Sequence, residues 1–190
     1  MPSELTKLVG RREEEACVAF TADVGRLGFE RTLKKFWVRL HEHTADVLHL
    51  HRSGISYGAP LNASVSFRLH LAIRVLNDSF PAIALNGPNT EGAPREGRYH
   101  LRFNAESLDS FDRCVQDLAR YVREVGEPWF ARFRGSDTLL SHGESPLQED
   151  AKTCLRAALD GRSSAEAVTL TKKALGTDRR AAASKATDAG

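Results

Sequence analysis

The sequence predicts an α+β fold, in which an antiparallel sheet of about four strands has one face covered by two amphipathic helices and is followed by a C-terminal helical tail. Three observations predict it. Segments with apolar residues at every second position recur between residues 36 and 103, and stretches with apolar residues three and four apart lie before and after them. Strict alternation is typical of strands with one covered face, whereas parallel strands buried on both faces are continuously apolar.

The first helix is predicted over residues 12–27, where the apolar side chains follow helical spacing. These side chains are Cys17, Phe20, Val24 and Leu27. Three glutamates, residues 13–15, place negative charge near the start of the predicted helix, where the helix dipole favours it. Gly28 follows, which is typical of a glycine that ends a helix in the left-handed conformation.

The strands are predicted from alternation, which is clearest over residues 64–75. Val65, Phe67, Leu69, Leu71, Ile73 and Val75 are expected to point inward, and Arg68, His70 and Arg74 outward. The same pattern predicts that Phe36, Val38, Leu40, Leu48, Leu50, Tyr99, Leu101 and Phe103 point inward. It predicts an outward position for Trp37, Arg39, His41, His49, His51, His100 and Arg102.

A second helix is predicted over residues 107–125, with Ser107 as its N-cap and with its end at Gly126 and Pro128. Its apolar stripe, which starts at Leu108 and ends at Val125, is expected to cover the inward face of the sheet.

One domain with appendages is expected from 190 residues. The predicted boundaries are 1–134 for the α+β core domain, 135–160 for a linker and a short helix, and 161–190 for a flexible tail that is alanine-rich and mildly basic. The net charge is +2, and the tail carries six Lys and Arg against three Asp and Glu. The basic character therefore belongs to the tail.

Three cysteines at wide spacing, Cys17, Cys114 and Cys154, match neither a disulfide framework nor a zinc pattern. They are expected to be reduced thiols in a cytoplasmic protein. The N-terminus lacks the features of a signal peptide, and no apolar run reaches the roughly 18 residues of a membrane span. Neither secretion nor a membrane anchor is expected, and no motif predicts a cofactor.

The order of these segments is similar to that of a family of small bacterial α/β proteins catalogued as a domain of unknown function, family 4304. The resemblance covers about residues 14–133 and rests on Leu27-Gly28-Phe29, Phe36-Trp37-Val38-Arg39, Tyr99-His100-Leu101-Arg102-Phe103 and Pro128-Trp129-Phe130. It implies an α+β fold and a bacterial source, and it carries no catalytic residue to this chain. Proteins of this size and kind are often partner-binding modules, and immunity proteins that neutralise toxins are among them.

Two motifs suggest chemistry that their context does not favour. Residues 54–58 match the Gly-x-Ser-x-Gly pattern of a nucleophile elbow, but a second strand follows where the elbow requires a helix, so a hairpin connection is expected. Two His-x-His pairs occur, at residues 41–43 and 49–51. His49 and His51, about 7 Å apart along a strand, would form a three-histidine metal site with His70, which is the less favoured interpretation because no carboxylate accompanies them.

The outward face as a whole is the preferred candidate site. Its expected partner-binding residues are Trp37, Arg39, His49, His51, Arg68, His70, Arg74, His100 and Arg102. Arginine pairs two oxygens at once, and histidines that are partly protonated near pH 6.5 would add positive charge. The alternative interpretation is a solvated polar face without a ligand. Residues 77–97 are expected to form a flap beside this face, or else a short packed element.

Three functional hypotheses follow. The first is a non-enzymatic binding module, immunity-like or regulatory, that holds an acidic protein partner on this face. The second is nucleic-acid binding by the same face and the basic tail, against which stand the small net charge and the few aromatic residues on the outward face. The third is a metal-dependent hydrolase that uses the strand histidines.

Overall fold

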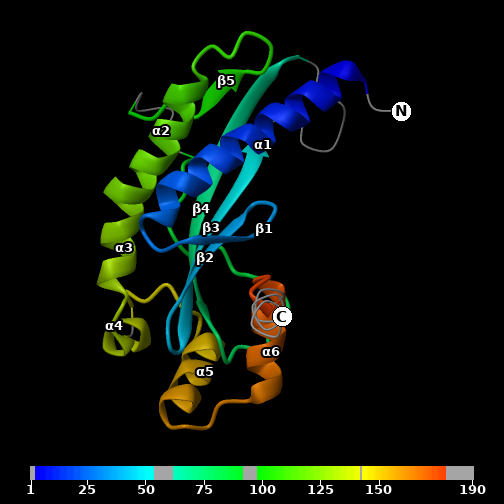
Figure 1. The fold of residues 1–190 in the computed structure, drawn as a ribbon. Coiled ribbons are helices and arrows are strands. Elements are labelled where there is room, and N and C mark those ends of the chain that lie inside the picture. Colours follow the sequence, from blue (N-terminus) through cyan, green and yellow to red (C-terminus); the bar gives the residue numbers. More distant parts are fainter. Residues whose placement is uncertain (1–2, 54–61, 92–97, 142, 179–190) are drawn as a thin grey trace.

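The computed structural model describes residues 3–53, 62–91, 98–141 and 143–178 (Figure 1). Its strands are β1 (Glu30–Leu33), β2 (Phe36–Leu40), β3 (Thr44–Ser53), β4 (Ser64–Val75) and β5 (Arg102–Asn104). Its helices are α1 (Glu4–Gly25), α2 (Phe111–Tyr121), α3 (Glu127–Arg132), α4 (Ser136–Leu140), α5 (Glu149–Leu159) and α6 (Ala165–Ala174). The five strands form one antiparallel sheet in sequence order, which confirms the predicted α+β class with one more strand than expected.

Helix α1 packs on one face of the sheet through the apolar stripe that the sequence predicts. Phe20 and Val24 are fully buried, and Phe20 meets the ring of Trp37 edge-on at 4.9 Å between centroids. The helix begins earlier than predicted, because Ser3 caps it by accepting a hydrogen bond from the Thr6 amide. Gly28 has a φ of +84°, which confirms the predicted left-handed glycine after the helix.

The long hairpin of β3 and β4 forms the centre of the sheet. In β4 the predicted alternation is confirmed, since Val65, Phe67, Leu69 and Leu71 are all buried in the main core beneath α1 and α2. Toward the end of β4 both faces are buried, because Ala72 belongs to a second apolar cluster on the opposite face. The prediction that only one face of the sheet is covered is therefore wrong for this half.

Helix α6 covers the second cluster, and Figure 1 shows it on the other side of the sheet from α2 and α3. Leu175, directly after α6, is fully buried against Val38, Val47 and Ala72. Residues 165–175 thus pack against the sheet. This part of the chain buries more apolar surface than the predicted flexible tail would. Residues 139–155 also contribute to the main core, through Leu139, Leu147 and Leu155.

Helix α2 continues into α3 through a π-helical turn over Val122–Gly126, so the predicted end at Gly126 and Pro128 is wrong. The backbone stays helical at Tyr121, Gly126 and Glu127. Pro128 follows the π turn in the first turn of α3, where proline is tolerated because it lacks only an amide donor that a helix start leaves unpaired. The helix also starts later than predicted, after Ser110 rather than Ser107.

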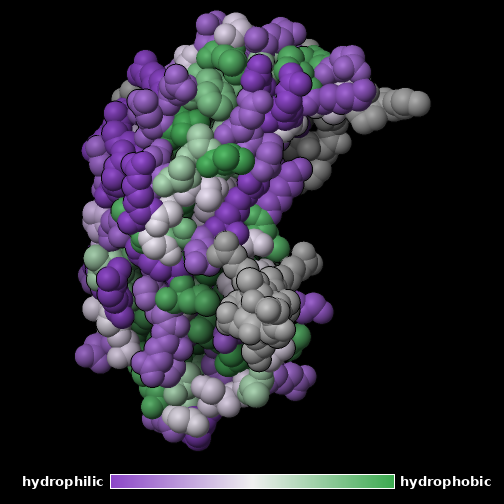
Figure 2. All heavy atoms as spheres, in the orientation of Figure 1, coloured by the Kyte–Doolittle hydropathy of each residue, from purple (hydrophilic) through white to green (hydrophobic). Residues whose placement is uncertain are grey.

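The segment after β4 follows the edge of that strand instead of forming a separate flap. The Gly87 and Thr90 amides donate hydrogen bonds to the carbonyls of Leu71 and Leu69, each at 3.0 Å. A Cβ on Gly87 would lie 2.6 Å from the Trp129 ring, so only glycine permits this approach. On the face shown in Figure 2, hydrophilic side chains predominate along α1 and α2.

Candidate functional site

Strand register decides which predicted site residues share a face. Trp37 lies opposite Leu48, and Leu48 lies opposite Leu71, so this row points into the main core. The predicted orientation of residues 36–41 is therefore wrong: Trp37 is 0% exposed and donates from Nε1 to Thr21 Oγ1 at 2.8 Å. Phe36, by contrast, lies opposite His49 on the other face of the sheet.

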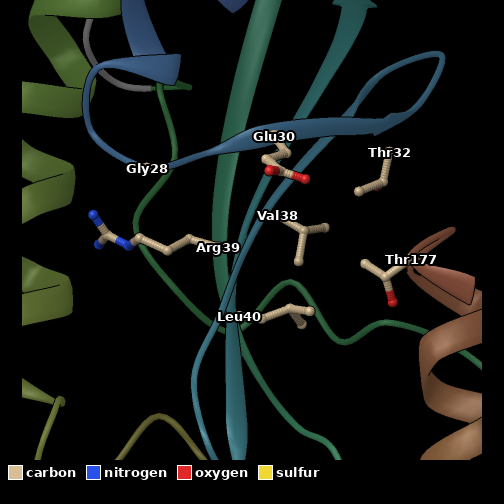
Figure 3. A pocket seen from close by; sticks show the side chains of 7 residues that line it. All are labelled: Gly28, Glu30, Thr32, Val38, Arg39, Leu40 and Thr177. Atoms are coloured by element: carbon tan, nitrogen blue, oxygen red, sulfur yellow. The ribbon is translucent and has the colours of Figure 1, made fainter. Parts of the chain in front are cut away.

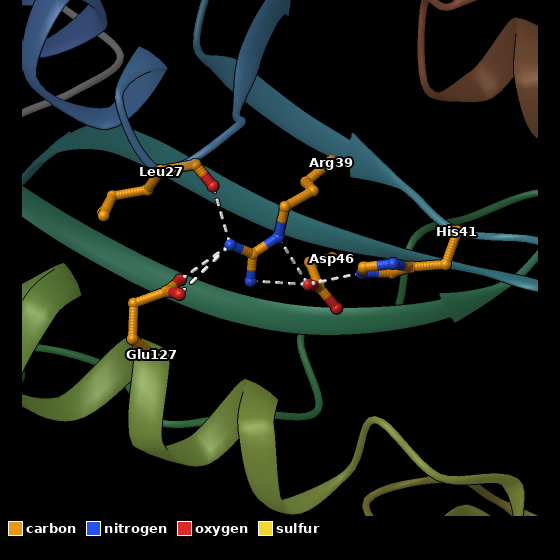
Figure 4. Close-up of polar contacts among 5 residues, drawn as sticks. All are labelled: Leu27, Arg39, His41, Asp46 and Glu127. Carbon is orange, nitrogen blue, oxygen red and sulfur yellow. Dashed lines mark hydrogen bonds and ion pairs between the residues drawn. The ribbon is translucent and has the colours of Figure 1, made fainter.

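Arg39 shares the covered face with Trp37 and is the centre of a buried polar cluster (Figure 4). Its guanidinium donates from Nε and Nη2 to Asp46 Oδ2, at 3.0 and 2.8 Å. Nη1 donates to the Leu27 carbonyl at 2.8 Å and to Glu127 at 3.1 Å. With 13% of its side chain exposed, Arg39 joins the turn after α1, the sheet and α3, so the open position that the sequence predicts for it is wrong.

Arg74 lies on the opposite face, as predicted, but is also buried, with 5% of its side chain exposed. It forms an ion pair with Asp78 at 2.9 Å and donates to the carbonyls of Phe80 and Ala82. Burial lowers the pKa of its guanidinium. Arg74 fastens the segment after β4 to the sheet, so its predicted exposure is wrong.

The remaining outward residues of β3 and β4 do come together. His49, His51, His70 and Arg68 lie on one face, next to the apolar cluster that α6 covers, and we call these four residues the histidine patch. The His51 and His70 rings stack with centroids 5.0 Å apart, and His49 lies 5.5 Å from His51. Phe36 stacks on His49 at 4.3 Å. The sequence predicted this grouping, and the strand register confirms it.

The imidazoles of the patch are easier to deprotonate than ordinary histidines. The pKa of His49 is lowered to about 4, mainly by burial and in smaller part by the charges of the neighbouring histidines and Lys35. Burial also lowers the pKa of His51, and the charge of Arg68 adds to this effect. For His70, burial lowers the pKa together with the charges of His51 and Arg68. Near pH 6.5 these three histidines therefore carry less positive charge than the sequence predicts, and His49 is neutral at that pH.

Arg68 supplies the permanent positive charge of the histidine patch. Its guanidinium forms an ion pair with Glu91 at 3.0 Å, and the two side chains are 33% and 61% exposed. Nearby, Lys35 pairs with Glu13 of α1. Arg68 and Lys35 thus each have an acidic partner. The alternation of the strands could not predict these ion pairs, because Glu13 and Glu91 lie on other elements.

Arg102 and His100 lie at the edge of the sheet. Arg102 is exposed and faces Ser66 of β4, on the same face as the patch. The strand predicted over residues 99–103 is only β5, Arg102–Asn104. His100 precedes it, and its backbone amide donates to Asp117 of α2 at 2.6 Å.

The patch has some but not all features of a metal site. His49 Nδ1 and His70 Nε2 are buried and have no hydrogen-bond partner among the residues that the structure describes. Neutral imidazoles are good ligands for Zn²⁺. However, the rings of His51 and His70 are nearly parallel, at 20°, and within the described ranges no three His, Cys, Asp or Glu side chains are placed to hold a metal ion. This arrangement argues against the metal-dependent hydrolase.

A hollow of about 380 Å³ lies beneath the β1–β2 hairpin on the face of the sheet that α6 covers. Glu30, Thr32, Val38 and Leu40 point toward it, and Thr177 closes it from the end of α6, while Arg39 points away (Figure 3). The hydroxyl of Thr32 is buried without a hydrogen-bond partner in the described part of the chain. Nothing in the sequence distinguishes these residues, because the hollow forms only when the end of α6 meets the hairpin.

Other sequence features remain open. The Gly-x-Ser-x-Gly motif at residues 54–58, and part of the segment 77–97, lie outside the described residues. Every helix in the described ranges is too short or too polar to cross a membrane. No family model matches this chain, and neither a curated protein nor a solved structure was found to be significantly similar to it.

Proposed function

We propose that this chain is a non-enzymatic binding module that holds an acidic protein partner on the histidine patch. The observation that carries the proposal is the grouping of Arg68 with three half-buried imidazoles on one sheet face. An immunity-like or regulatory protein of the bacterial cytoplasm is the kind of module that we infer.

The ion pair between Arg68 and Glu91 favours exchange with a partner. An exposed pair of this kind contributes only about 0–1 kcal/mol, so a carboxylate of the partner replaces Glu91 at little cost. The planar guanidinium then binds the two oxygens of the new carboxylate together. Arg68 is therefore the expected centre of the interface.

The lowered pKa values of the patch histidines make the binding of an acidic partner depend on pH. A carboxylate that approaches His51 or His70 raises its pKa, because the negative charge favours the imidazolium form. The patch consequently gains positive charge as the acidic partner binds, and binding takes up protons. Affinity for an acidic ligand should increase as the pH falls from 7 toward 5.

A fluorescein-labelled decapeptide of alternating glutamate and serine tests this proposal by fluorescence anisotropy at pH 6 and 50 mM salt. Arg68→Gln should weaken binding at least fivefold. Arg132→Gln is the matched control, because Arg132 is also exposed and paired, with Glu144, but lies outside the patch. The control should bind like the wild type.

A single-stranded 20-nucleotide DNA serves as the second ligand. The proposal is wrong if the peptide does not bind at 50 mM salt, or if Arg68→Gln binds it as tightly as the wild type. Tighter binding of the DNA than of the peptide, with a steep loss in high salt, would overturn it in favour of the nucleic-acid hypothesis.

A further inference from the structure

A second cavity, larger than the hollow beneath the hairpin, lies at the end of β4. It has a volume of about 450 Å³ and is enclosed by β4, by residues 78–86 and by the start of α5. This volume lies within the range of about 300–1,000 Å³ that is usual for small-molecule sites. The cavity shares strand β4 with the histidine patch, but none of its lining residues belongs to that patch.

The lining is mainly apolar. Ile73 and Val75 of β4 and Leu147 before α5 are buried in the protein interior, and Ala151 of α5 lines the same cavity. Phe80, which is 59% exposed, also lines it. An exposed phenylalanine beside an apolar cavity gains contact area when a ring or a branched chain enters, so the occupant should have an apolar body.

The charged groups of the lining leave a net negative charge. Asp78 is neutralised by its ion pair with Arg74 at 2.9 Å, and Arg74 is committed further to backbone carbonyls. Asp150 also lines the cavity, and no ion pair joins it to any residue that the structure describes. The carboxylate lies in the first turn of α5, whose end carries about half a positive charge. The helix end therefore offsets the full charge of Asp150 only in part.

We propose that this cavity binds a small amphipathic amine, with its apolar body against Ile73, Leu147 and Phe80 and its ammonium group beside Asp150. The amine is favoured over a carboxylic acid because the lining holds one more carboxylate than cation. It is favoured over a purely apolar molecule because a carboxylate at the wall of an apolar cavity strengthens the binding of a cation.

Cys154 provides an internal reporter for this site. Its thiol lines the cavity and is partly exposed, whereas Cys17 and Cys114 are buried. Burial raises the pKa of the Cys154 thiol, so a maleimide reacts slowly enough with it for rates to be compared. A molecule in the cavity should slow this reaction.

The test uses three probes of similar size: 2-phenylethylamine, 2-phenylethanol and phenylacetate. Their binding to the full chain is measured by calorimetry and by the rate at which N-ethylmaleimide modifies Cys154. We expect the amine to bind at least fivefold more tightly than the alcohol and at least tenfold more tightly than the acid. The amine should also slow modification of Cys154 at least threefold at saturation.

Two variants locate the site. Asp150→Asn should weaken the amine at least fivefold and leave the alcohol unchanged, whereas Asp137→Asn, the equivalent first-turn acid of α4, should change neither. Ala151→Leu fills the cavity and should weaken all probes, while Ala157→Leu, elsewhere on α5, should not. Circular dichroism of each variant verifies folding.

The proposal is overturned if the amine does not bind at 10 mM, or if phenylacetate binds as tightly as the amine. It is also overturned if Asp150→Asn binds the amine like the wild type. None of these results depends on the histidine patch, so the failure of either proposal leaves the other standing.

Discussion

Arg39 and Asp46 face each other across the β2–β3 ladder, and the guanidinium donates two hydrogen bonds to a single oxygen of the carboxylate. The same oxygen lies 2.8 Å from His41 Nε2, and the guanidinium also covers the Phe29 ring at 4.4 Å. Both charges are nearly buried, so each depends on the other, and Arg39 is compensated further by Glu127.

Asp46→Asn should lower the free energy of unfolding by about 1.5–3 kcal/mol, because it removes the more buried of the two carboxylates that pair with the Arg39 guanidinium. Urea denaturation at pH 7 measures the effect. Glu144→Gln, which breaks an exposed pair with Arg132, should change stability by no more than about 0.5 kcal/mol. A loss of less than about 1 kcal/mol in Asp46→Asn would show that the pair is not a structural centre.

Acid should destabilise the protein through the histidine patch. The pKa of His49 is about 4 in the folded chain and near 6.5 in an unfolded one, so between these values the unfolded chain binds more protons. The free energy of unfolding therefore decreases as the pH falls from 7 to 5. The stabilisation that neutral His49 contributes is fully present above about pH 6.5 and is lost as the pH falls toward about 4. His51 and His70 act in the same direction.

His49→Phe should flatten this pH dependence, because the phenylalanine keeps the stacking contact with Phe36 but takes up no proton. Urea denaturation at pH 7, 6 and 5 gives the slope, and His43→Gln, outside the patch, is the control. An unchanged slope in His49→Phe would contradict the low pKa of this imidazole.

Gly28 and Gly25 provide a matched test of the end of α1. Gly28→Ala should destabilise the fold by about 1 kcal/mol, since alanine is strained at a φ of +84°. Gly25→Ala should stabilise it by about 0.5–1 kcal/mol, because Gly25 is helical and a Cβ there meets nothing within 4 Å. Thermal unfolding distinguishes the two, and equal effects would show that the backbone turns elsewhere.

Leu175→Ala should cost about 2–4 kcal/mol or release α6 from the sheet, because Leu175 is fully buried between α6 and the second cluster. Amide hydrogen exchange in residues 165–175 measures the release. Leu170→Ala, at a side chain that is 48% exposed, should leave exchange unchanged. Slow exchange in both variants would mean that α6 is held by other contacts.

The elements with one clear apolar period could be predicted from the sequence. The alternation in residues 64–71 of β4 and the stripe of α1 place almost all of the predicted core correctly, because these segments have a single buried face. The same alternation correctly predicts that the members of the histidine patch share a face, since the register of a straight hairpin follows from period two.

The alternation in strand β2 predicts the wrong orientation, because its more apolar face meets the smaller second cluster and its face with Trp37 and Arg39 meets the main core. Phe36, Val38 and Leu40 lie on one face of the strand, and Trp37 lies on the other. Alternation alone does not determine which of these faces meets the main core. Two residues of α1 favour the observed orientation. The Thr21 hydroxyl accepts a hydrogen bond from the Trp37 indole, and the Phe20 ring packs against the Trp37 ring. Once Trp37 points inward, Arg39 must point inward two residues later, and Asp46 on the next strand and Glu127 of α3 compensate its buried charge.

The π-helical turn at residues 122–126 sets the angular position of everything that follows it along the helix. Deleting one residue of this turn would restore a regular helix and rotate α3 by about 100° relative to α2. Glu127 and Phe130 both contact the Arg39 guanidinium, and this rotation would break both contacts. A change of a single residue in chain length at this point therefore disconnects α3 from the sheet although no side chain in the cluster is altered.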